Sequence, residues 1–129
     1  MSYDLHGICH PHWDATNISA DVNNPKKVVG DWNYFKVYPE YQINGLEFMV
    51  TTCTVTDENL DMSFPIFEDT CPSMAVQAMQ LTPNPVMDVF GLQYRAFMFQ
   101  NDSNDENTEM TLSCQVKVCL AGNCNPEQC

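Results

Sequence analysis

The sequence predicts an all-β protein, folded as an antiparallel β-sandwich. Short segments rich in β-branched and aromatic residues are separated by turn-forming residues, and no helical segments alternate with them. Seven cysteines in 129 residues are a high content. Such a content is typical of secreted domains stabilised by disulfides, because cytosolic proteins rarely carry it without metal or redox chemistry. The length is that of a single domain with a modest core.

The N-terminal residues differ in character from the rest. Residues 1–30 are polar and have no steady period, which favours an extended leader or a segment like an interdomain linker. We assign residues 31–129 to the sandwich domain. Its first strand is predicted by "NYFKVY", which ends at Pro39, and its second by "LEFMVTTCTV" (46–55).

The middle third of the chain favours loops and edge strands, because proline cannot donate a hydrogen bond to a sheet. Its four prolines are Pro65, Pro72, Pro83 and Pro85. The segment "SMAVQAMQL" (73–81) has apolar residues at helical spacing and predicts a short helix, although a strand there is an open alternative.

The last two predicted strands are joined by the polar loop "NDSNDENTE". The first, "FGLQYRAFMFQ" (90–100), has apolar residues on both faces, and we interpret the second face as covered by a partner. The other, "MTLSCQVKVC" (110–119), has one apolar face, which we expect to be buried. That face comprises Met110, Leu112, Cys114, Val116 and Val118.

Four cysteines end the chain at regular spacing: Cys114, Cys119, Cys124 and Cys129. A zinc knuckle requires its thiolates to converge on one point, but the predicted strand directs Cys114 and Cys119 to opposite faces. A redox Cys-x-x-Cys motif is absent. Disulfides therefore account for the tail better than a metal site.

Strand geometry favours one set of disulfides. Cys119 and Cys124 flank a turn at "LAGN" and form the shortest loop. The inward-facing Cys114 requires a partner on another core strand, where Cys53 lies. The pairs are then Cys53–Cys114, Cys71–Cys129 and Cys119–Cys124. Six cysteines allow many connectivities, so other pairings stay open on this ground alone.

Five basic against 17 acidic residues give a net charge of -12. This charge disfavours nucleic acid and anionic membranes as partners, because phosphates would be repelled, and it favours cationic partners. N-glycosylation sequons at Asn17 and Asn101 agree with an oxidising compartment.

The order of motifs in the C-terminal part resembles a known family. It comprises an aromatic strand "YRAFMFQ", the polar loop, the strand "MTLSCQVKVC" and the cysteine-rich tail "LAGNCNPEQC". Earlier cysteines lie in "FMVTTCTV" and "DTCPS". Together these motifs resemble the C-terminal half (ZP-C) of a zona pellucida module, over residues 32–129.

The resemblance implies an immunoglobulin-like antiparallel β-sandwich with three internal disulfides, in the pairs given above. It also implies a secreted structural glycoprotein subunit. Such a subunit assembles with itself or with other zona pellucida-type subunits into an extracellular filament, coat or matrix, without enzymatic activity or a cofactor. Two alternatives stay open: an extracellular ligand-binding module, such as a receptor ectodomain fragment, and a secreted effector that does not polymerise.

Two features depart from the family pattern. The first 30 residues are too few to hold an N-terminal sandwich, and neither a basic cleavage site nor a hydrophobic propeptide follows Cys129. Assembly by the family's usual mechanism is therefore an open question for this chain alone.

The N-terminal segment is the predicted assembly site. Three disulfides use six of the seven cysteines and leave Cys9 unpaired. In an oxidising compartment a free thiol usually forms a disulfide with another chain. An extended segment can also add a strand to the open sheet edge of a neighbour. The apolar anchors that we expect there are Val28, Val29, Trp32, Phe35 and Val37.

Two segments have metal-ligand residue types. In the first, imidazole and thiolate suit zinc or copper, but Pro11 prevents a helix that would align them. That set is His6, Cys9, His10, His12 and Asp14. In the second, the calcium-loop glycine and terminal glutamate are missing. That set is Asp102, Asn104 and Glu106. We interpret them as a leader and a solvated loop, and expect no metal.

Catalysis finds little support in the sequence. All three histidines lie in the first 30 residues, so no buried Ser–His–Asp or Cys–His pair is predicted. We interpret the scattered carboxylates as a solvated face. They include Glu40, Glu47, Asp57 and Asp61.

Overall fold

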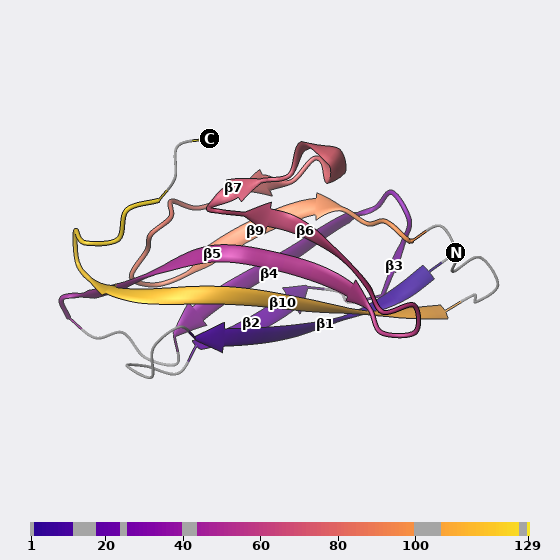
Figure 1. Cartoon of the computed structure of the whole chain (residues 1–129), viewed down its shortest axis with the longest axis horizontal. Helices are drawn as coiled ribbons and strands as arrows, with labels where there is room; N and C mark the ends of the chain where they lie inside the picture. Colours follow the sequence, from indigo (N-terminus) through magenta and orange to yellow (C-terminus); the bar gives the residue numbers. More distant parts are fainter. Residues whose placement is uncertain (1, 12–17, 24–25, 40–43, 100–106, 127–128) are drawn as a thin grey trace.

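The computed structural model describes residues 2–11, 18–23, 26–39, 44–99, 107–126 and 129. These residues form two β-sheets and one short 3₁₀ helix, η1 (Met74–Val76). The sheets lie one over the other (Figure 1) and share one hydrophobic core. The predicted immunoglobulin-like β-sandwich is confirmed.

The larger sheet has six strands. Their spatial order is β3 (Lys26–Val28), β1 (Ser2–Pro11), β10 (Asn107–Leu120), β5 (Leu46–Asp57), β6 (Met62–Glu68) and β7 (Cys71–Pro72). The smaller sheet has four strands, in the order β2 (Ile18–Asn23), β4 (Trp32–Pro39), β9 (Phe90–Arg95) and β8 (Met79–Gln80). Among these described strands, neighbours are antiparallel except β1 and β10, which run parallel.

Three predicted strands are confirmed. β4 ends at Pro39 as expected, β5 extends the predicted 46–55 to Asp57, and β10 extends the predicted 110–119 at both ends. The inward face expected for β10 is also confirmed, because its five apolar side chains are at most 4% exposed. They are Met110, Leu112, Cys114, Val116 and Val118.

A β-bulge fits β5 to this face. The register between β5 and β10 shifts where Thr51 stands as an extra residue in β5. Val50 and Cys53 are both fully buried, although strict alternation would place residues three apart on opposite faces. The bulge therefore lets β5 bury both side chains against the core.

The helix predicted over residues 73–81 is only three residues long. Gln77 adopts the left-handed conformation, with φ 53° and ψ 40°, and ends η1 after Val76. The chain then forms β8, and Leu81 N–H donates to the Gly91 carbonyl. The strand alternative is thus correct for the second half of the segment. Pro72 lies in the edge strand β7, as the prolines predicted.

The strand predicted over residues 90–100 ends earlier, at Arg95. Ala96 bonds instead to the turn before β4: its N–H donates to the Asp31 carbonyl, and its carbonyl accepts from Gly30 N–H. The alternation between two faces, on which the prediction for residues 90–100 rested, therefore ends at Arg95.

The aromatic residues after β9 are covered by their own chain. The ring of Phe97 lies edge-on to Phe64, Tyr94 and Phe99, with centroid separations of 5.6, 6.2 and 5.7 Å. Phe97, Met98 and Phe99 are partly buried against the core. The apolar residues that suggested a covering partner are therefore largely packed against their own chain, and a partner on this face stays a prediction.

The N-terminal segment contributes strands to both sheets. β1 lies beside β10 (Figure 1), with pairs from Ser2–Asn107 to Pro11–Val116. β3 pairs with the beginning of β1, and β2 pairs with β4. Most of the segment expected to be an extended leader is thus strand in this structure, and the domain boundary at residue 31 stays a prediction.

Candidate assembly site

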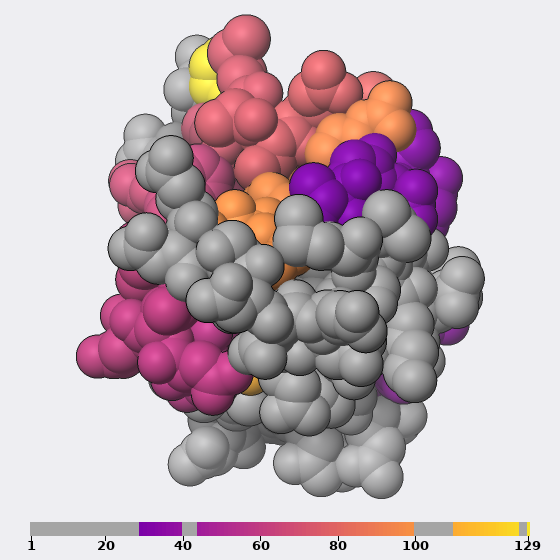
Figure 2. All heavy atoms as spheres, turned by 90° about the vertical axis from the view of Figure 1, so that its right-hand side faces the viewer, coloured from indigo at the N-terminus to yellow at the C-terminus, as the bar shows by residue number. Residues whose placement is uncertain are grey.

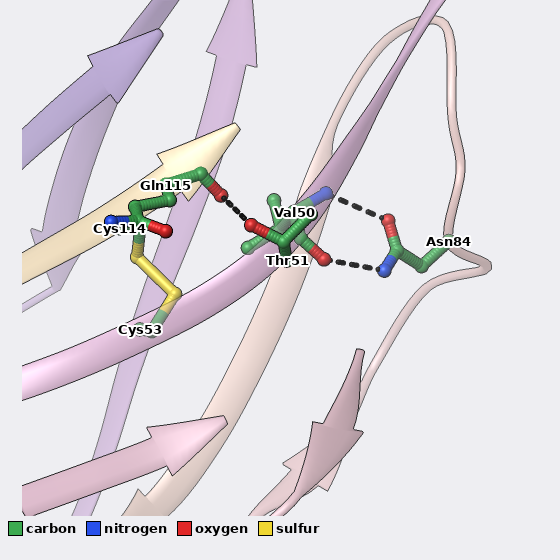
Figure 3. Close-up of a disulfide and its surroundings, with 6 residues drawn as sticks. All are labelled: Val50, Thr51, Cys53, Asn84, Cys114 and Gln115. Atoms are coloured by element: carbon green, nitrogen blue, oxygen red, sulfur yellow. Dashed lines mark hydrogen bonds between the residues drawn. A yellow bond between two sulfur atoms is a disulfide. The ribbon is translucent and has the colours of Figure 1, made fainter. Parts of the chain in front are cut away.

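The Cys53–Cys114 disulfide joins β5 and β10, the two longest described strands, where they are in register. Both cysteines are fully buried, and their Cα atoms are 4.1 Å apart. Figure 3 shows the bridge between the strands. The structure therefore brings together the two residues that strand geometry favoured as partners.

The other two disulfides hold the C-terminal tail. Cys119–Cys124 closes a short loop in which Gly122 has φ +86°, a conformation that glycine adopts without strain. The Glu47 carboxylate accepts a hydrogen bond from Gly122 N–H at 2.9 Å. Cys71–Cys129 joins β7, at the edge of the larger sheet, to the last residue. The tail is thus fixed at both of its ends.

Asn84 completes the edge of β5 with its side chain. Its Oδ1 accepts from Val50 N–H at 3.0 Å, and its Nδ2 donates to the Val50 carbonyl at 2.9 Å (Figure 3). Two residues later, Val86 forms an isolated β-bridge with Phe48. The Asn84–Pro85 peptide bond is cis. The segment around Asn84 therefore pairs with β5 where no strand does.

The seventh cysteine lies in β1. In the strand register, Cys9 is paired with Cys114, and Cys114 with Cys53, so three cysteine positions form one row across β1, β10 and β5. The structure thus places the backbone of Cys9 beside the buried bridge. A disulfide from Cys9 to another chain stays a prediction.

The five expected assembly residues do not form one surface. Val28 lies in β3, and Val29 follows it with 42% of its side chain exposed. Phe35 and Val37 are 3% and 0% exposed in the core of their own domain, so they are not available to a neighbour in this fold. Trp32 is partly buried and points to the opposite side of β4.

The outward side of the smaller sheet pairs cations with aromatic rings. The Arg95 guanidinium lies 3.8 Å from the ring centroid of Trp32, and Lys36 Nζ lies 5.6 Å from that of Tyr38. Tyr34 is exposed between them. We call this surface the aromatic–cationic face; it comprises Trp32, Tyr34, Lys36 and Tyr38 of β4, Gln93 and Arg95 of β9, and Met79 of β8.

The Arg95 side chain is held in place by two hydrogen bonds. Its Nε donates to Gln77 Oε1 and its Nη1 to the Gly30 carbonyl, each at 3.2 Å. The guanidinium therefore ties β9 to the turn before β4 and to the end of η1.

Several predicted site residues lie outside the described residues. They are the sequon asparagines Asn17 and Asn101, the ligand candidates His12, Asp14, Asp102, Asn104 and Glu106, and the carboxylate Glu40. For His6, Cys9 and His10 the structure gives only the strand register of β1.

One carboxylate expected on a solvated face is buried. Asp57 is 0% exposed, and its Oδ1 accepts from the N–H groups of Asn59 and Leu60 at 2.9 and 3.2 Å. This pattern is an Asx turn, which fixes the connection between β5 and β6. Glu58 and Asp61 in the same turn are exposed, as expected of solvated carboxylates.

Other chemistries find no support in the part of the chain that the structure describes. There, no three or more His, Cys, Asp or Glu side chains come together as metal ligands. None of the helices found among these residues is long and apolar enough to cross a membrane. The arrangement offers sheet edges, a rigid acidic turn and the aromatic–cationic face, which are surfaces for protein contacts.

Sequence patterns missed Asn84 and Arg95. Asn84 bonds to a residue 34 positions away, and no periodicity marks such a contact. Arg95 had one available signal, since alternation along "FGLQYR" directs it away from the core.

Comparison with known proteins gives one family. A family model described as the ZP-C domain of zona pellucida matches residues 12–129. No curated protein matches the chain. The match covers nearly the whole sandwich, including β2 and β3.

Proposed function

This chain belongs to the zona pellucida family as a ZP-C domain, and from that membership we propose that it is a secreted structural glycoprotein subunit of an extracellular filament, coat or matrix. The family is one of extracellular, non-catalytic modules that associate with other zona pellucida-type subunits. In this proposal the chain carries glycans at Asn17 and Asn101, and its partners are copies of itself or related subunits.

The pairing of the first strand with the last is the observation that carries assembly. β1 and β10 are parallel over ten residue pairs in a sandwich whose other described pairs are antiparallel. Without β1, the backbone donors and acceptors on one side of β10 would lack partners, and such an edge accepts a strand from another chain. β1 thus occupies a position that a neighbouring subunit can fill.

The turn before β4 permits the exchange. Gly30 has φ +95°, a conformation that glycine reaches without strain. β1 precedes residues 31–129 in the chain, so its transfer to a neighbour breaks no connection within those residues. Exchange of an identical element between protomers is a low-cost route to assembly.

In this mechanism residues 1–28 of one subunit add strands to the next subunit. Donor and acceptor surfaces differ, so the contact is heterologous, and its repetition gives a filament or a ring. Cys9 lies in β1, so strand exchange brings it into the neighbouring subunit, where it can form a disulfide between the two chains. The anchors within the exchanged segment and its turn are Val28 and Val29.

Size-exclusion chromatography and electron microscopy of the full chain test assembly, and filaments or discrete multimers are expected. A synthetic peptide of residues 1–28 with Cys9→Ser, added in excess, should occupy free β10 edges and shorten the multimers. A scrambled peptide of the same composition is the control and should have no effect. A strict monomer that binds a soluble protein with nanomolar affinity would instead support the ligand-binding module.

A further inference from the structure

The aromatic–cationic face has the composition of a protein interface. Interface centres are enriched in Trp, Tyr, Met and Arg and depleted of Asp and Glu. β4, β8 and β9 contain no acidic residue, although the chain carries 17. Tyr34 and Met79 are 38% and 52% exposed on this face. The smaller sheet therefore presents aromatic and apolar surface to the outside.

The cations of this face are not neutralised by described carboxylates. Arg95 and Lys36 lie over aromatic rings, and no carboxylate among the residues whose side chains the structure describes forms an ion pair with either. The acidic position that the strand register brings nearest is Asp21 of β2, opposite Lys36. Of the hydrogen-bonding nitrogens of Arg95, described acceptors engage Nε and Nη1. Nη2 remains free in that part of the chain to bind a carboxylate from outside.

The β5–β6 turn offers such carboxylates on a rigid support. Glu58 and Asp61 are exposed there, and the Asx turn of Asp57 fixes the backbone that carries them. A preorganised loop loses less conformational freedom on binding than a flexible one. The turn, magenta at the lower left in Figure 2, projects from the surface.

Turn and face cannot meet within one molecule. The turn belongs to the larger sheet, and the face lies on the outward side of the smaller sheet. In Figure 2 the turn lies at the lower left, whereas the purple spheres of residues 29–39, which include β4, lie at the upper right. A contact between them therefore requires two copies, and its two surfaces differ.

We infer that this face docks the acidic β5–β6 turn of a second copy of the chain. The inference rests on the proposed assembly and adds a contact that does not involve the β10 edge. A chain with net charge -12 repels its copies, and this face holds two of the five Lys and Arg residues, which attract an acidic turn of another copy. A glycan is the weaker occupant, because the Arg95 guanidinium already stacks on the Trp32 ring that a sugar would use.

Isosteric substitutions test the face. Gln93→Glu places a carboxylate between the two cations and should weaken self-association about tenfold, as like charges at an interface do. Asn125→Asp is the matched control, because it adds the same charge at an exposed position outside both the face and the β10 edge, and should leave association unchanged. Sedimentation velocity of the full chain measures both, and circular dichroism verifies that each variant is folded.

A charge exchange tests the turn. Lys36→Glu and Glu58→Lys should each weaken association, and the double variant should restore it, because the reversed charges attract again. Glu68→Lys, at the exposed last residue of β6, is the control and should have no effect. Raised salt should weaken the wild-type contact, since exposed charges are screened.

The outcomes separate this inference from the assembly proposal. If the wild-type chain assembles and the variants assemble equally well, the docking inference is wrong, but strand exchange is not contradicted. A wild-type chain that stays monomeric overturns both. If the monomer binds a polyglutamate peptide or a neutral oligosaccharide, and Gln93→Glu abolishes that binding, the face exists but its occupant is not a second copy.

Discussion

Asn84 shows how one side chain can take the place of a strand. β6 pairs with β5 only over residues 53–57, so the backbone of β5 around Val50 needs another partner. The amide of Asn84 supplies an acceptor and a donor in the spacing of a peptide group. Asn carries the shortest side chain that offers a donor and an acceptor on two separate atoms.

Asn84→Ala should lower the free energy of unfolding by about 1–3 kcal/mol, because the N–H and carbonyl of the buried Val50 lose their partners. Urea denaturation followed by tryptophan fluorescence measures the change. Asn125→Ala, at an exposed position, is the control and should stay within about 0.5 kcal/mol of wild type. Equal stability of both variants would show that water replaces the amide.

Residues were predictable where alternation governs them. The inward direction of Cys114 followed from the period of two along β10, and its pairing with Cys53 followed from the place of Cys53 on another predicted core strand. Asn84 could not be predicted in this way, because its bonds depend on which loop passes β5. Alternation does place Asp57 inward, after Cys53 and Val55, but its charge favoured a solvated position, and the local turn that accepts it inside was not considered.

Among the elements, the strands with apolar alternation could be predicted and the polar ones could not. β4, β5 and β10 carry their own hydrophobic faces. β1 has no steady apolar alternation, and its pairing with β10 defines it. β2 is an exception, because its Ile18, Ala20 and Val22 alternate in a strand of only six residues and were missed. The end of β9 could not be predicted from alternation either, because Ala96 leaves the sheet and forms hydrogen bonds with Gly30 and Asp31.

Phe97→Asp should destabilise the domain by about 2 kcal/mol or more, because it removes a ring packed among three others and buries a charge. Thermal unfolding measures the effect. Met74→Asp, at a side chain that is 92% exposed, is the control and should change stability little. A folded Phe97→Asp variant that fails only in assembly would support the idea of a partner on this side.

For the whole molecule, the fate of Cys9 distinguishes an assembled from an isolated chain. Strand exchange carries Cys9 into a neighbouring subunit, and in an oxidising compartment its thiol should form a disulfide between chains. Non-reducing gel electrophoresis should show a dimer or a ladder that Cys9→Ser collapses to monomer. A monomer band with a titratable thiol, or Cys9 bonded within its own chain, would contradict this expectation.

The long disulfides also determine how the protein responds to mechanical tension. Cys53–Cys114 spans 61 positions and Cys71–Cys129 spans 58, and the two loops overlap. A force applied at the chain ends passes through the sulfur atoms and bypasses most of the polypeptide between them. Such a pull can straighten the residues before Cys53, but the sandwich strands after it remain enclosed in covalent loops. A fibre built from these subunits would therefore stretch by releasing its N-terminal strands, and would recoil when they pair again.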